Sequence, residues 1–136
     1  MRFHHIGLFV PDLAGGRQSL SALLPVRDWE AEIDDPGLRV RVQFGLDAAG
    51  VRYELVAPLG EKNPVEGALR TGRNILNHVA YCVDDIAAER GRLEAEGCFS
   101  MTEPHPAVAF GGRPVMFLMT PLRFILELIE EPAPAE

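Results

Sequence analysis

Four residues of the types that bind metal ions recur at one spacing in this 136-residue chain. His5 stands near the start of a strand-like run, and His78 stands in a similar run 73 positions later (78 − 5 = 73). Glu54 and Glu127, in the tetrapeptides YELV and LELI, are separated by the same 73 positions. Two separate segments with one common offset indicate an internal repeat. In this repeat His is aligned with His and Glu with Glu.

Two imidazoles and two carboxylates form a mixed nitrogen and oxygen donor set with a total charge of −2, which neutralises a divalent cation. Such donors suit Zn, Ni, Co, Mn or Fe and leave positions for water or substrate in an octahedral geometry. A single strand histidine is more commonly packed in a core, and a single strand glutamate is more commonly exposed. The offset that the two His and the two Glu share favours a functional role for these four residues over those ordinary roles. We predict a divalent metal site made by His5, Glu54, His78 and Glu127. The sequence does not identify which of these metals binds.

The elements that must position these residues occur in the same order in both halves. The first half reads as a strand, a helix, three strands and a short helix that begins after Asn63, and the second half repeats the strand, the helix and the three strands. Proline and glycine clusters separate the elements. The predicted ranges are 4–10, 13–24, 29–33, 38–46, 51–57 and 64–70, and then 76–83, 86–96, 98–103, 115–120 and 124–130.

This order predicts an α+β fold. We expect a single domain over residues 1–136 that is built from two tandem βαβββ repeats, 1–70 and 74–131. Pairing of the repeats about a pseudo-twofold axis would form a cupped mixed sheet around the metal site. A homodimer is also expected, because small proteins of this build often pair further and twofold oligomers are common.

The composition excludes several other classes of protein. Hydrophobic residues make up 47% and charged residues 24% of the chain, and no apolar run approaches the ~20 residues that a membrane span needs. A net charge of −7 argues against binding to a nucleic-acid backbone. Cys82 and Cys98 are interpreted as reduced thiols, and the N-terminal sequence has no signal-peptide pattern. We therefore expect a cytoplasmic location.

Several segments resemble the vicinal oxygen chelate superfamily, which includes glyoxalase I, extradiol dioxygenases, bleomycin-resistance proteins and methylmalonyl-CoA epimerases. These segments are HHIGLFVPDL, YELVAPLGEKNPVEGAL, NHVAYCVDDIAA, GGRPVMFL and LELIE, and the resemblance extends over nearly the whole chain. They are most similar to the methylmalonyl-CoA epimerase branch, above all in the strand that ends in APLG before an Asn-Pro helix start. The resemblance implies a divalent metal at the same four positions.

The resemblance implies a metal-dependent isomerase that acts at a C–H next to a carbonyl, with methylmalonyl-CoA or another 2-substituted acyl thioester as the substrate. Glu127 is then the expected base, and Glu54 is the second carboxylate at the metal. Two alternatives remain. One is a glyoxalase I-like lyase, or another metal-dependent enzyme of the superfamily, on a small oxygenated substrate. The other is a ligand-binding protein of the bleomycin-resistance type, which would need no metal.

One departure from the family concerns residues 38–44. Some epimerases of this family carry a second catalytic carboxylate on the matching strand, but this segment contains no acid. Inversion of a carbon centre needs an acid–base group on each of the two faces of that carbon, unless one group can reach both faces. The sequence leaves the second group unidentified.

Five further residues are candidates for substrate contacts. Arg39 and Arg41 would project from one strand face and suit a carboxylate or phosphate, although solvated charge is the ordinary role of such residues. Phe110, Gly112 and Arg113 belong to a glycine-rich loop that could close over a site, or be a plain hairpin loop.

Overall fold

The computed structural model describes residues 1–134, so the last two residues of the expected 1–136 domain lie outside the described part. It confirms an α+β fold in which mixed parallel and antiparallel strands form βαβββ-like modules. The chain divides into two compact units. The N-terminal unit is residues 5–77. The C-terminal unit is residues 1–4 together with the chain from residue 78 onward.

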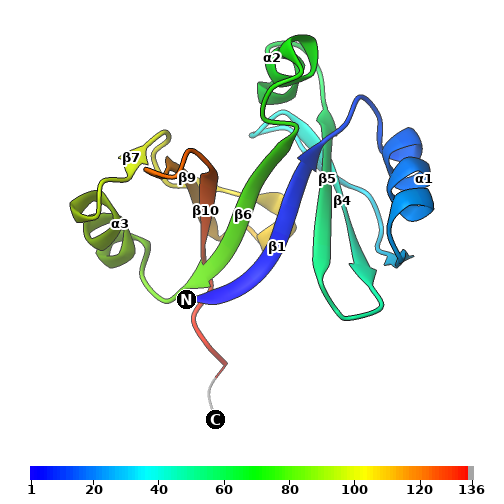
Figure 1. Ribbon diagram of the computed structural model, residues 1–136. Coiled ribbons are helices and arrows are strands. Elements are labelled where there is room, and N and C mark those ends of the chain that lie inside the picture. Colours follow the sequence, from blue (N-terminus) through cyan, green and yellow to red (C-terminus); the bar gives the residue numbers. More distant parts are fainter. Residues whose placement is uncertain (135–136) are drawn as a thin grey trace. The chain divides into compact units, whose positions relative to one another are not determined.

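The N-terminal unit has the strand order β2-β4-β5-β1, with β3 also paired to β4. Strands β1 and β5 are parallel, and the β4 pairs are antiparallel. Figure 1 shows α1 beside β4 and β5. The elements are β1 (Arg2–Phe9, of which residues 2–4 belong to the other unit), α1 (Leu13–Leu23), β2 (Val26–Trp29), β3 (Ile33–Asp35), β4 (Val40–Asp47), β5 (Arg52–Pro58) and α2 (Pro64–Thr71).

The C-terminal unit has the corresponding order β6-β10-β9-β7, with β8 also paired to β9. Strands β6 and β10 are parallel, and the β9 pairs are antiparallel. Its elements are β6 (Leu76–Val83, of which residues 76–77 belong to the other unit), α3 (Ile86–Ala95), β7 (Phe99–Ser100), β8 (His105–Pro106), the 3-10 helix η1 (Val108–Phe110), β9 (Pro114–Met119) and β10 (Ile125–Glu130).

Side-chain caps begin the helices where the sequence predicts them. Asn63 accepts hydrogen bonds from the backbone N–H groups of Val65 and Glu66, both at 3.0 Å, and Pro64 occupies the first helical position of α2. The carboxylate of Asp85 accepts from the N–H of Ala88 at 3.1 Å at the start of α3. These starts confirm the predicted short helix after Asn63 and the predicted helix after Asp85.

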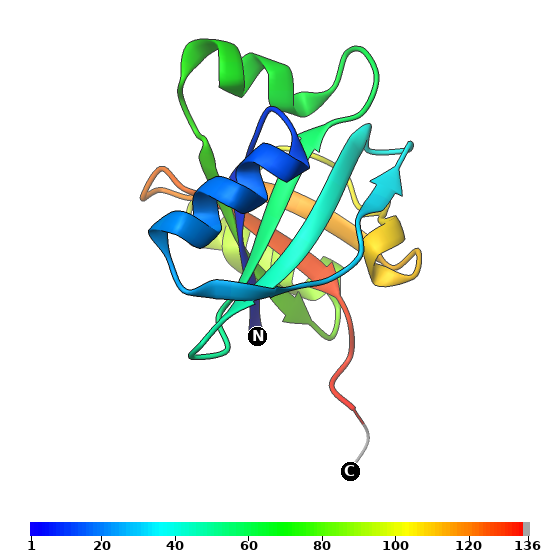
Figure 2. The ribbon, with the colours of Figure 1, turned by 90° about the vertical axis from the view of Figure 1, so that its right-hand side faces the viewer.

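One sheet face in each unit packs against a helix. In the N-terminal unit α1 lies across β4 and β5 (Figure 2), and its Leu13 and Leu20 contact Leu55 and Ala57. In the C-terminal unit the contacts of α3 form a second core of Val83, Ile86, Leu93, Met116, Leu118, Leu126 and Leu128. Because side chains alternate along a strand, the residues between these core positions point to the opposite face. We call that opposite face the site face of each unit.

Two predicted strands differ from the structure. The single strand expected at 29–33 is wrong, because Trp29 ends β2, Ile33 begins β3, and residues 30–32 form no strand between them. The break begins at Glu30, whose carbonyl accepts from the Gln43 side chain at 2.7 Å. The strand expected at 98–103 is also shorter, since β7 comprises only Phe99–Ser100. Among residues 1–134, no helix combines the length and apolar character that crossing a membrane requires.

Candidate metal-binding residues

The N-terminal unit joins His5 and Glu54 as a buried pair. His5 is on β1 and Glu54 is on the adjacent parallel strand β5, where the Cα partner of Glu54 is Gly7. His5 lies two residues before Gly7, so its side chain shares the site face with Glu54. The Nε2 atom of His5 is 3.3 Å from an oxygen of Glu54. Exposed fractions of 0% for His5 and 6% for Glu54 place both groups away from bulk water.

The C-terminal unit makes the same arrangement from the second repeat. His78 is on β6 and Glu127 is on the parallel strand β10, where the partner of Glu127 is Ala80. Ala80 is again two residues beyond the histidine. The Nε2 atom of His78 is 3.2 Å from an oxygen of Glu127, and both residues are buried.

An aromatic residue accompanies each pair, and sequence reasoning missed both. Phe44 on β4 lies directly opposite Glu54, and its ring is 5.4 Å from the His5 ring in an edge-to-face contact. Phe117 on β9 lies opposite Glu127, and its ring is 5.6 Å from the His78 ring in a similar geometry. The two phenylalanines are also 73 positions apart, so the spacing already marked them. Their rings hold the imidazoles in one orientation.

Burial makes an ordinary surface role for these pairs untenable. Charged side chains are rarely fully buried unless they are paired or bind a metal. Each of the four residues offers one ligand atom of a type that binds metal ions. Nitrogen and carboxylate oxygen donors fit a first-row divalent metal, and the two carboxylates balance its charge. The residues present therefore fit the group that the sequence predicts.

Comparison with known proteins places the chain in a family. The model of the glyoxalase/bleomycin resistance protein/dioxygenase superfamily matches residues 4–117. The chain belongs to this superfamily. Members of the vicinal oxygen chelate superfamily, as it is also called, provide the similar relatives. The ethylmalonyl-CoA/methylmalonyl-CoA epimerase of Cereibacter sphaeroides is 32% identical over 118 residues, covering 86% of this chain and 87% of that protein.

Two further relatives extend this comparison. The human mitochondrial methylmalonyl-CoA epimerase is 29% identical over 118 residues, covering 86% of this chain and 65% of that protein. The structure of a Streptomyces coelicolor methylmalonyl-CoA epimerase variant in complex with 2-nitronate-propionyl-CoA has a TM-score of 0.74 at 20% identity, covering 95% of this chain and 93% of that chain. The structural likeness shows that the two chains share the vicinal oxygen chelate fold.

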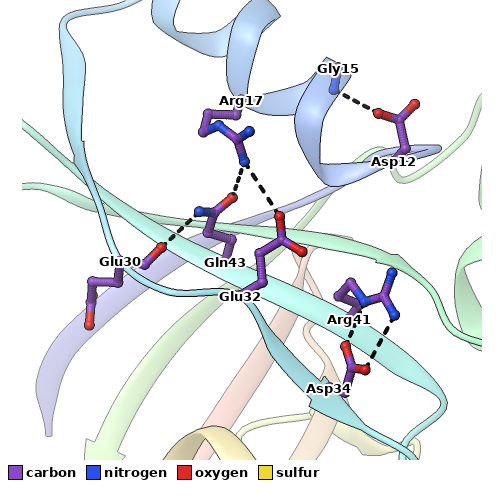
Figure 3. Close-up of polar contacts among 8 residues, drawn as sticks. All are labelled: Asp12, Gly15, Arg17, Glu30, Glu32, Asp34, Arg41 and Gln43. Atoms are coloured by element: carbon purple, nitrogen blue, oxygen red, sulfur yellow. Dashed lines mark hydrogen bonds and ion pairs between the residues drawn. The ribbon is translucent and has the colours of Figure 1, made fainter.

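The two arginines expected to contact substrate have protein partners. Arg41 forms a two-point ion pair with Asp34, with nitrogen–oxygen distances of 2.5 and 3.2 Å (Figure 3). The hydrogen bond from Arg41 lowers the pKa of the Asp34 carboxyl. Arg41 lies opposite Ala57, which belongs to the α1 core, so its side chain leaves β4 on the face away from Glu54. The guanidinium of Arg39 donates to the carbonyl of Lys62 at 3.0 Å.

The glycine-rich loop of this vicinal oxygen chelate chain is closed on itself by backbone hydrogen bonds. The N–H of Gly112 donates to the carbonyl of Ala107 at 2.9 Å. Arg113 forms an ion pair with Glu131 at 2.7 Å, and the ring of Phe110 packs edge-to-face on His4. A substrate contact by the loop or by the two arginines stays a prediction.

Proposed function

We propose that the protein is a metal-dependent epimerase that inverts the carbon next to the carbonyl of a 2-substituted acyl thioester, as the methylmalonyl-CoA epimerases do. The observation that carries the proposal is the pair of buried His–Glu arrangements at matching positions of the two repeats. The named epimerase relatives, which match most of the chain, favour this activity over other reactions of the superfamily.

His5, Glu54, His78 and Glu127 would together hold one divalent cation, which is Co, Ni, Zn, Mn or Fe. When bound, the cation supplies Lewis acidity toward a substrate carbonyl oxygen, which makes the neighbouring C–H more acidic. The chain contributes the rest. Phe44 and Phe117 orient the imidazoles, and burial of the four donors excludes bulk water, which strengthens electrostatic interactions at the site.

Glu127 is the proposed base. Its carboxylate takes the proton from the substrate carbon as the electron pair moves into the adjacent carbonyl, and inversion requires that a proton then reach the opposite face of that carbon. Glu54 is the matching carboxylate of the other repeat, and we assign it first to metal binding. The acyl-CoA named in the Streptomyces complex supports the choice of an acyl thioester as the proposed substrate. We also propose a homodimer in the cytoplasm, where Cys82 and Cys98, which form no disulfide in the described structure, remain reduced.

Metal content and epimerisation test this function together. Elemental analysis of the purified protein should find one divalent transition metal per chain. A single epimer of methylmalonyl-CoA in deuterated water should be inverted and labelled at the reacting carbon. Replacement of any one of the four residues by Ala should lower metal occupancy sharply, because a buried donor is lost.

The control for these variants is His4→Ala, since His4 neighbours His5 in sequence but belongs to neither pair. This variant should keep its metal. Full metal content in three of the four ligand variants would refute the shared site. Bound metal without inversion or labelling of the thioester would refute the epimerase and return the glyoxalase-like lyase as the leading activity.

A further inference from the structure

Two exposed basic residues, Arg39 and Lys62, lie side by side in the N-terminal unit. Arg39 is the last residue of the turn before β4, and Lys62 lies in the loop that joins β5 to α2. The guanidinium of Arg39 donates to the carbonyl of Lys62 at 3.0 Å. The carbonyl of Arg39 accepts from the N–H of Leu59 at 3.1 Å. These two hydrogen bonds hold the turn against the loop, so both basic side chains leave the surface at one edge of the unit.

No carboxylate of residues 1–134 forms an ion pair with either basic group, and this includes Glu61, the neighbour of Lys62 in sequence. One carbonyl occupies only part of the donor capacity of the Arg39 guanidinium. Other arginines of the chain do pair with carboxylates, namely Arg2, Arg17, Arg41, Arg90, Arg92 and Arg113. Two adjacent cations without an acid create a local positive potential, which attracts an anion to a chain of net charge −7.

The backbone gives a second reason to look for a role of these side chains. Both residues are in the left-handed region, with φ of 59° at Arg39 and 56° at Lys62. Glycine adopts this region without a steric cost, as Gly60 does in the same loop with φ of 77°. Longer side chains at such positions are uncommon and often mark functional sites. The side chains of Arg39 and Lys62 are therefore candidates for ligand contacts.

The position of the two residues limits which part of a substrate they can meet. Val40, which follows Arg39, lies opposite Pro58 on β5. Pro58 is four residues beyond Glu54 on the same strand, roughly 13 Å along an extended chain. A carboxylate bonded to the reacting carbon would lie too close to Glu54 to contact Arg39. The phosphate groups of coenzyme A can lie that far away, because the long pantetheine arm separates them from the thioester.

We propose that Arg39 and Lys62 bind a phosphate group of the coenzyme A part of the substrate, a role that rests on the proposed function. A guanidinium presents its N–H donors in one plane to phosphate oxygens, and an ammonium group adds a point charge. Coenzyme A offers this chemistry in its diphosphate and in its 3′-phosphate. The two residues anchor the substrate and take no part in proton transfer, so they stabilise the ground state and the transition state alike.

Substrates that differ in their phosphate groups test the proposal. Arg39→Gln and Lys62→Gln should each raise the KM for methylmalonyl-CoA by about 10-fold with kcat unchanged, because a charge-assisted contact is lost from both states. Neither variant should alter the kinetics of methylmalonyl-pantetheine, which carries no phosphate. In calorimetric titration, coenzyme A itself should bind each variant about 10-fold more weakly than it binds the wild type.

Titration with 3′-dephospho-coenzyme A identifies the phosphate that is bound. The variants should bind this compound as tightly as the wild type if Arg39 and Lys62 hold the 3′-phosphate. The loss of about 10-fold should persist if they hold the diphosphate. In both cases the affinity of the wild type for coenzyme A should fall as the salt concentration rises, because salt screens exposed charges.

Arg70→Gln is the matched control, because Arg70 is another exposed arginine of the N-terminal unit and lies near the opposite end of α2 from Lys62. This variant should bind coenzyme A as the wild type does. An equal loss in Arg70→Gln would overturn the proposal, since it would indicate general attraction by net charge. An equal rise of KM for methylmalonyl-CoA and methylmalonyl-pantetheine would also overturn it, since it would indicate a general disturbance of the fold.

The same measurements separate this proposal from the proposed function. Wild-type affinity for coenzyme A in both Arg39→Gln and Lys62→Gln, with normal epimerisation, would overturn the phosphate site and leave the proposed function intact. Wild-type protein that binds coenzyme A but epimerises neither thioester would refute the proposed function. Weaker binding of coenzyme A by the two variants would still support the phosphate site in that case.

Discussion

Glu54 and Glu127 are the same side chain at matching positions, so their neighbours must distinguish their roles. Each lies beside a histidine at 3.2–3.3 Å and opposite a phenylalanine. Phe44, opposite Glu54, is buried, whereas Phe117, opposite Glu127, is half-buried. Glu54 and Glu127 are themselves almost equally buried, with exposed fractions of 6% and 5%, so the assignment of Glu127 as the carboxylate that meets the substrate stays a proposal.

Glu127→Gln should therefore remove most proton exchange, by about 10²–10⁴-fold, because an amide oxygen can still bind a metal but cannot accept the proton. Metal content should fall less than in Glu127→Ala. Both quantities can be measured on the same preparations, by elemental analysis and by deuterium uptake.

Glu54→Gln is the comparison variant. It should lose less exchange than Glu127→Gln if Glu54 only binds the metal. Equal losses would mean that the two glutamates serve opposite faces of the substrate. Near-normal exchange in Glu127→Gln with metal still bound would exclude Glu127 as the base.

At the scale of elements, the pairing of β2 with β4 depends on a glycine. Gly45 lies opposite Trp29, and a Cβ atom at Gly45 would come within 2.7 Å of the Trp29 ring and 2.9 Å of Val26. Gly91, within α3, has no atom within 4 Å of the corresponding position. The same substitution should therefore have opposite effects at the two sites.

Gly45→Ala should lower the free energy of unfolding by about 1–3 kcal/mol through overpacking. Gly91→Ala should raise it by about 0.5–1 kcal/mol, because alanine loses less backbone entropy in a helix. Urea unfolding followed by the fluorescence of Trp29, the only tryptophan of the chain, measures both changes. If the free energy of unfolding changed in the same direction in both variants, the Trp29 contact would not be what limits the size of the side chain at residue 45.

At the scale of the whole molecule, exposed apolar side chains support association. In the C-terminal unit Phe99 is 71% exposed and Leu122 is 81% exposed. Sedimentation equilibrium at micromolar concentration should give twice the chain mass of 14.9 kDa. Phe99→Glu should shift the protein toward monomer with its metal content unchanged, whereas Gln18→Glu, which adds the same charge at an exposed polar position of α1, should not. A wild-type monomer would contradict the homodimer.

The sequence by itself determined the repeat, the order of elements and the donor set. These properties are local or periodic: Asn63 and Asp85 mark helix starts with side chains that cap the next turn, and one offset of 73 aligns both His–Glu pairs. Phe44 and Phe117 are separated by the same 73 positions. Their contact with the imidazoles became evident only when β4 and β9 were seen beside the glutamates.

Only the tertiary structure decided which face each remaining polar residue occupies. Arg41 and Asp35 are both near the turn that contains Pro36 and Gly37, yet β3–β4 pairing sends Arg41 to the α1 side and Asp35 to the site face. Register between strands is set by backbone hydrogen bonds and by packing against distant residues, and a shift of one residue would exchange the two faces. Because nothing in the local sequence specifies that register, a buried acid beside Val40 could not be recognised before the strands were paired.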